Sequence, residues 1–114
     1  MNLDSSEQPF GLLVTVGDSR IDASVAIQFK DRMRELTAGR PGRILLDLSQ
    51  VDFVDSSGLG AIVAALKQLE ADQTLELAAL SPTVSKVFRL TRMDKVFPIH
   101  ETLEQATGPR ANAS

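Results

Sequence analysis

Two adjacent serines in the middle of the chain are the residues best placed to do chemistry. Ser56 and Ser57 lie in the run DSSGLG at residues 55–60, directly after the apolar stretch 51–54. A helical stripe of apolar residues follows, so the run is expected where a strand ends and a helix begins. In α/β proteins that position is exposed and is where sites are built. The free N–H groups of a first helical turn would also favour an anion beside either hydroxyl.

A purely structural role accounts for part of this run. Asp and Ser are common helix N-caps, and Gly58 eases a tight turn. Capping explains one of three polar residues, but not two adjacent serines flanked by glycine. Because Gly58 and Gly60 lack a Cβ atom, another backbone could approach the run closely. Capping and a functional site both remain open on this pattern.

Catalysis by the same serines has little support in the sequence. A nucleophilic Ser56 needs a base, and the chain's one histidine, His100, follows the last predicted strand. The run is not Gly-x-Ser-x-Gly, and no Gly-Lys-Ser/Thr phosphate loop is present. Asp47 or Asp55 would lack the partners of a phosphate-accepting receiver. We therefore expect no enzyme, and keep a serine hydrolase built on Ser56 and His100 as the enzyme alternative.

The composition restricts the possible partners. The 114 residues suffice for one domain, and they contain no cysteine and one histidine, so we expect neither a metal site nor a cofactor. A net charge of -3 argues against nucleic acid and anionic membranes as partners. Residues 1–9 are polar and acidic rather than signal-like, and the apolar-rich stretch 59–66 is too short to span a bilayer. A cytoplasmic protein without membrane contact of its own is expected.

The hydrophobic pattern predicts alternating strands and helices. A first helix is expected from Asp22, as its N-cap, to about Thr37, and a later one from Ser81 with Pro82 in its first turn. The helix after the serine run should end near residue 72, and a last helical turn covers 102–106. Strands are expected at 10–16, 43–48, 74–80 and 96–99. Such alternation implies an α/β domain with a mainly parallel sheet.

One domain accounts for this pattern. It covers residues 10–106, with 1–9 as an N-terminal tail or short edge strand and 107–114 as a frayed C-terminal tail.

Two long segments resemble the STAS domain family, the anti-sigma-factor antagonists of bacteria. They are RILLDLSQVDFVDSSGLGAIVAAL at 43–66 and SPTVSKVFRLTRMDKVFPIHETLEQA at 81–106, and the resemblance extends over roughly residues 10–106. It implies a single STAS-like domain with a mainly parallel, mixed sheet of four or five strands and helices packed on one face. It also implies a protein-binding switch rather than an enzyme.

The resemblance further implies the partners of this switch. The unphosphorylated protein would sequester an anti-sigma factor that is also an ATP-dependent serine kinase. The kinase would phosphorylate Ser56 and so be released, and a serine phosphatase would reverse the modification. The partner-binding residues would be Asp55, Ser57, Gly58, Leu59, Asp22, Ala23 and Ser24. Of these, Leu59 is also a candidate core residue.

Two departures from the family pattern concern the partner-facing edge. Few residues precede Phe10, which leaves little room for the family's N-terminal hairpin, and the turn at residues 17–22 is two residues looser than usual. The alternative function within the family is a STAS domain that is never phosphorylated. Such a domain would be a subunit of a transporter or of a larger signalling assembly.

Overall fold

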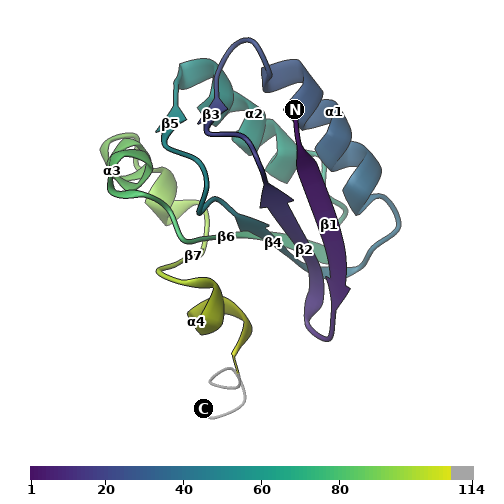
Figure 1. Ribbon diagram of the computed structural model, residues 1–114. Coiled ribbons are helices and arrows are strands. Elements are labelled where there is room, and N and C mark those ends of the chain that lie inside the picture. The colour runs from purple at the N-terminus through teal and green to yellow at the C-terminus, as the bar shows by residue number, and fades with distance from the viewer. Residues whose placement is uncertain (109–114) are drawn as a thin grey trace.

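A mainly parallel sheet forms the centre of the molecule. The computed structural model describes residues 1–108, and within them five strands form one sheet in the order β1-β2-β4-β6-β7. All neighbours in this sheet are parallel except the antiparallel pair β1 and β2. The strands are β1 (Leu3–Gln8), β2 (Gly11–Val16), β4 (Gly42–Asp47), β6 (Gln73–Ala78) and β7 (Ile99–His100). The predicted α/β class with a mixed sheet is confirmed (Figure 1).

Three helices cover one face of this sheet. They are α1 (Ala26–Thr37), α2 (Ser56–Lys67) and α3 (Pro82–Leu90). Alternate residues of the strands face them, and the apolar side chains of both layers form the main core. That core includes Phe29, Met33, Ile62, Val84 and Phe88 from the helices, and Leu12, Val14, Ile44, Leu46, Leu75 and Leu77 from the strands. Ser81 caps α3 as predicted, because its side chain accepts a hydrogen bond from the Val84 N–H.

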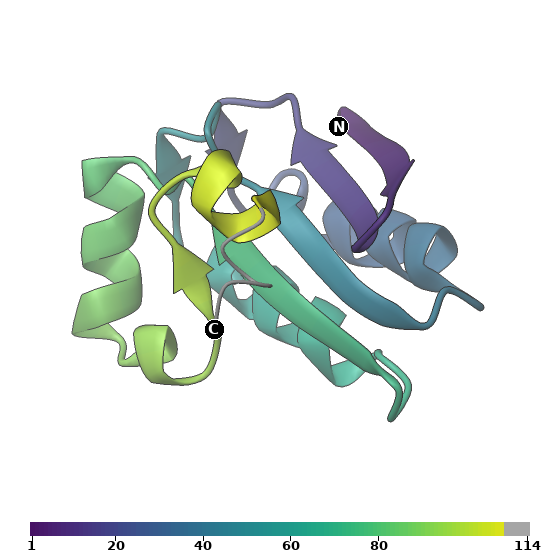
Figure 2. The ribbon, with the colours of Figure 1, turned by 90° about the horizontal axis from the view of Figure 1, so that it is seen from below.

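A fourth, short helix lies on the opposite face of the sheet (Figure 2). This helix, α4 (Leu103–Thr107), begins after the N-cap Thr102 and packs Ala106 in a second buried cluster with Leu45 and Ala78. The expectation that helices pack on one face therefore holds for α1 to α3 and not for α4. Within the tail predicted at 107–114, Thr107 belongs to α4, and residues 109–114 lie outside the described residues.

The N-terminal residues form a full hairpin, which corrects the expectation that little room existed for one. Leu3 to Gln8 pair with Gly11 to Val16 along the whole length of both strands. β1 is the edge strand, and Leu3 is its one buried residue. An exposed edge strand has no need of an apolar pattern, so β1 leaves little signal in the sequence.

The first helix begins at Ala26 and not directly after Asp22. The Asp22 carboxylate accepts hydrogen bonds from the N–H and hydroxyl of Ser24, at 3.0 and 2.6 Å, and so closes a local turn instead of capping the helix. Before this turn, β3 (Arg20–Ile21) pairs in parallel with β5 (Phe53–Val54) in a small second sheet. Strands of two residues leave no periodic pattern, so this pairing is not predictable from the sequence.

Two further boundaries differ from the predicted ones. The helix α2 ends at Lys67 rather than near residue 72, and the last strand covers Ile99–His100 rather than 96–99. A 3-10 turn, η1 (Met93–Lys95), precedes that strand, and Phe97 packs edge-on against the ring of Phe88 at 6.0 Å between centroids. None of the helices within residues 1–108 is both long and apolar enough to cross a membrane.

Candidate functional site

The serine run lies at the start of α2, directly after β5. Asp55 is the N-cap of this helix, and its Oδ1 atom accepts a hydrogen bond from the Gly58 N–H at 2.8 Å. Ser56 and Ser57 are the first two helical residues, and both are exposed. We call residues 55–58 the serine turn. As the sequence predicted, it joins the carboxyl end of a strand to the amino end of a helix.

The second oxygen of Asp55 reaches a different part of the chain. Oδ2 accepts a hydrogen bond from the Ala23 N–H at 3.3 Å, so one carboxylate links the serine turn to the Asp22–Ser24 segment. We call residues 22–24 the aspartate turn. The two segments are more than thirty residues apart in the sequence and were each predicted to contact a partner. The structure places them side by side.

Gly58 allows this close approach. A Cβ atom at this position would lie 1.8 Å from the backbone oxygen of Ile21 in β3, so no larger residue fits without moving that strand. The predicted close approach of another backbone segment at Gly58 is therefore confirmed. At Gly60 no other part of the described chain makes such an approach, because no heavy atom beyond its immediate surroundings in the helix lies within 4 Å of a Cβ built there.

Leu59 contributes to the core as well as to the surface. It is half-buried and packs against the main core with the other partly buried residues of α2. Its side chain therefore offers a partner only part of its surface. Ser57, in contrast, lines a surface groove between α1 and α2.

Arg20 and Phe53 support the aspartate turn, and the sequence analysis missed both. The Arg20 guanidinium lies 4.2 Å from the centre of the Phe53 ring and pairs with Asp22 at 3.3 Å. The Ser24 hydrogen bonds, together with Arg20, hold the pKa of Asp22 below its usual value. Only the pairing of β3 with β5 brings Arg20 to Phe53, and two-residue strands leave no periodic signal in a sequence.

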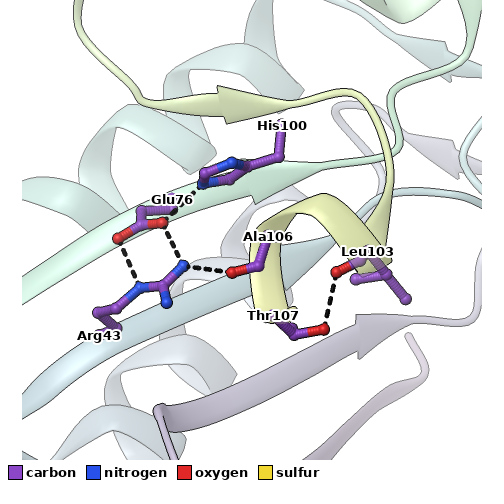
Figure 3. A network of polar contacts seen from close by, with 6 residues as sticks. All are labelled: Arg43, Glu76, His100, Leu103, Ala106 and Thr107. Atoms are coloured by element: carbon purple, nitrogen blue, oxygen red, sulfur yellow. Dashed lines mark hydrogen bonds and ion pairs between the residues drawn. The ribbon is translucent and has the colours of Figure 1, made fainter. Parts of the chain in front are cut away.

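His100 gives Ser56 no catalytic base. Its side chain lies on the sheet face that α4 covers, where Nε2 is 2.8 Å from Oε1 of Glu76 (Figure 3). Ser56 starts a helix that packs on the other face. The Ser56 and His100 pair of the enzyme alternative is therefore not assembled in this fold.

Comparison with known proteins agrees with this geometry. The family model described as STAS domain matches residues 6–106. An anti-sigma-B factor antagonist of Listeria monocytogenes is 32% identical over 93 residues, which are 80% of this chain and 81% of that protein.

Solved structures share the fold. An anti-sigma-factor antagonist (STAS) domain protein from Planctomyces limnophilus superposes with a TM-score of 0.85 at 23% identity, over 98% of each chain. SpoIIAA of Bacillus, in its phosphorylated form, has a TM-score of 0.65 at 21% identity, over 92% of this chain and 96% of its own.

The family match begins within β1 and ends within α4, and thus includes both the serine turn and the aspartate turn. The solved STAS structure shares the overall fold across nearly the whole chain. On these grounds the chain belongs to the STAS domain family.

Proposed function

We propose that this chain is an anti-sigma-factor antagonist that binds its partner through the serine and aspartate turns and is switched by phosphorylation of Ser56. The observation that supports it most is the double role of Asp55, which joins the two turns through Gly58 and Ala23. Ser56 remains exposed, and its hydroxyl makes no hydrogen bond to any residue that the structure describes. A kinase would therefore find an accessible hydroxyl beside two turns that Asp55 joins.

The domain itself should tolerate a phosphate at Ser56. A phosphoserine adds about 1.5 to 2 negative charges at neutral pH. The N-terminus of α2 favours an anion by roughly 0.3–1 kcal/mol, and the nearby carboxylate of Asp55 opposes it by a comparable amount in water. These two effects nearly cancel, so the free energy of unfolding should change little.

An interface that covers Ser56 responds differently. A buried charge without a counterion costs several kcal/mol. A penalty of ~3–4 kcal/mol would weaken binding by a factor of several hundred, because about 1.4 kcal/mol corresponds to tenfold in affinity. The carboxylates of Asp22 and Asp55 lie in the same two turns, so they add to the negative charge that a phosphate at Ser56 would bring to the interface. Phosphorylation would therefore release the partner while the domain stays folded.

The partner in this proposal is an anti-sigma factor with ATP-dependent serine kinase activity. The relative in Listeria is named for its action against an anti-sigma factor, and SpoIIAA has a phosphorylated form. A serine phosphatase would restore the binding form. Because a sigma factor acts on transcription, the site of action would be the cytoplasm.

A pull-down from native lysate tests the proposal. Three baits are compared: wild type, Ser56→Asp, and the control Ser5→Asp, which makes the same change at an exposed serine on the edge strand β1. We expect wild type and Ser5→Asp to retain a serine kinase and Ser56→Asp to lose it. Mass spectrometry identifies the captured proteins and locates phosphate on the native chain.

Two results would contradict the proposal. If all three baits retain the same transporter or scaffold protein, the domain is a constitutive subunit and Ser56 is only part of a helix start. If phosphate is found on Ser57 and never on Ser56, the site of the switch has been assigned to the wrong serine.

A further inference from the structure

Gly60 is an unexplained residue in an otherwise well-formed helix. Glycine inside a helix is less favourable than alanine, because the free backbone loses more entropy on folding. Gly58 has a reason within the chain, which is its contact with Ile21. Gly60 has none among the described residues: a Cβ atom would meet no heavy atom within 4 Å, and its φ angle is not in the left-handed region. The reason for this glycine is therefore sought outside the domain.

Gly60 lies in a groove between α1 and α2, which run side by side (Figure 1). The groove has a volume of about 210 Å³ and a mostly apolar lining. We call it the α1–α2 groove; its lining residues are Ala26, Ile27, Lys30, Ser57, Gly60, Ala61 and Ala64. Ser57 belongs to both the groove and the serine turn, so the two surfaces are continuous.

Two α1 residues along the groove have side chains that lack a partner within the described part of the domain. Ile27 is 71% exposed, although it is a large aliphatic residue. Lys30 forms no ion pair with any described residue, whereas the other charged residues of α1 pair with each other, as Asp31 does with Arg34 and Arg32 with Glu35. An apolar side chain and a free cation thus border the same groove.

We propose that the α1–α2 groove receives a helix of the partner protein, which places one large apolar side chain against Ile27 and one carboxylate against Lys30. The small residues Gly60, Ala61 and Ala64 let a helix backbone come close. The unpaired Lys30 selects an acidic residue through charge complementarity. This inference rests on the proposed function only for the identity of the partner.

Other occupants fit less well. The helix α4 of this chain lies on the opposite face of the sheet and does not cover the groove (Figure 2). A second copy bound about a twofold axis through the groove would bring Lys30 toward Lys30, and like charges repel. A partner helix with a carboxylate satisfies both the apolar residues and the charge.

The test measures the affinity of four variants for the purified protein that the wild-type bait retains. Gly60→Ala should raise the melting temperature by roughly 2–6 °C, since helix propensity improves, and yet weaken binding by about tenfold, since the added methyl group occupies the groove. Ile27→Ser and Lys30→Glu should each weaken binding by about tenfold or more. Lys86→Glu, an equal charge change at an exposed position of α3, is the control and should bind like wild type.

Cross-linking locates the carboxylate. A carbodiimide joins an amine to a carboxylate only when the two are in contact, so Lys30 in the wild-type complex should be linked to an acidic residue in a partner helix. Changing that residue to lysine should restore the affinity that Lys30→Glu lost. Gly60→Ala, Ile27→Ser and Lys30→Glu variants that all bind like wild type would overturn the inference, as would sedimentation showing that the groove joins two copies of this chain.

The two proposals fail in different ways. If the groove variants weaken binding while Ser56→Asp binds normally, the groove holds the partner and the phosphorylation switch is wrong. If Ser56→Asp releases the partner while the groove variants bind normally, the switch stands and the groove inference is wrong. A wild-type protein that retains no partner from native lysate would overturn both.

Discussion

At the scale of single residues, Gly58 makes the sharpest prediction. Replacing it with alanine puts a methyl group into the backbone oxygen of Ile21, so β3 must shift away from α2. We expect Gly58→Ala to lower the free energy of unfolding by about 1–3 kcal/mol, as other overpacked sites do. Urea unfolding measures this change. Gly60→Ala is the matched control in the same helix, and equal effects of the two substitutions would contradict the assigned role of Gly58.

The sequence specified some of these residues better than others. The polar residues 55–57 indicate a helix cap, because they stand between an apolar strand and an apolar helical stripe, but the pattern does not tell which of them provides it; in the structure it is Asp55. Asp22 carried the same signal and was misassigned, since its carboxylate bonds Ser24 within a turn that precedes the helix. A short polar residue before a helix fits a cap and a turn equally well. The hydrogen bonds to Ser24, with the helix starting only at Ala26, identify Asp22 as part of a turn.

At the scale of elements, one polar network ties α4 to the sheet (Figure 3). Arg43 on β4 donates two hydrogen bonds to Glu76 on β6, at 2.9 and 2.7 Å, and a third to the Ala106 oxygen in α4 at 2.9 Å. His100 on β7 meets the same carboxylate. Glu76 thus joins three strands, and Arg43 connects them to the helix.

This network makes stability depend on pH in the acid range. Burial alone would raise the pKa of Glu76, but the bonds from Arg43 and His100 outweigh it, and the pKa lies below its usual value of 4.5. A lowered carboxyl pKa stabilises the fold above the unfolded pKa, and that stabilisation is lost as pH falls through the folded one. Glu76→Gln should therefore lower stability at pH 7 by about 1–3 kcal/mol and flatten the decline below pH ~4.5.

Urea unfolding between pH 3 and 7 checks this expectation. Glu35→Gln on the exposed face of α1 is the control, because its ion pair with Arg32 is solvated and should contribute at most about 1 kcal/mol. If wild type and Glu76→Gln lose stability in parallel as the pH falls, the Glu76 network does not cause the loss of stability at acid pH.

The elements that escaped the sequence analysis share a physical cause. The central strand β4 is buried on both faces and β6 mainly on one, and the apolar residues of both mark them in the sequence, whereas β1 has one buried residue. The strands β3 and β5 have two residues each, too few for any periodicity. Their positions depend on contacts between residues that are distant in the sequence, and local sequence patterns do not reveal such contacts.

At the scale of the whole molecule, the two polar clusters occupy opposite sides of the sheet. The serine turn starts α2 on one face, while Glu76 and its partners lie beneath α4 on the other, and within residues 1–108 no hydrogen bond or ion pair joins the two clusters. Sites without shared partners usually act additively on stability, within about 0.5 kcal/mol. The fold therefore separates the residues that hold it together from those that control binding.

This separation predicts the outcome of a double-variant experiment. Ser56→Asp should change the melting temperature by less than about 3 °C while it lowers partner affinity several-hundred-fold, because the charge is tolerated by the helix and not by the interface. Glu76→Gln should do the opposite, lowering the melting temperature and leaving the affinity of the folded protein unchanged. The double variant should show both effects at nearly their single-variant sizes. Calorimetry for stability and titration for affinity, at a temperature where every variant is folded, measure the two effects separately. If Ser56→Asp lowers the melting temperature as much as Glu76→Gln does, partial unfolding would explain the loss of binding and the switch would not be electrostatic.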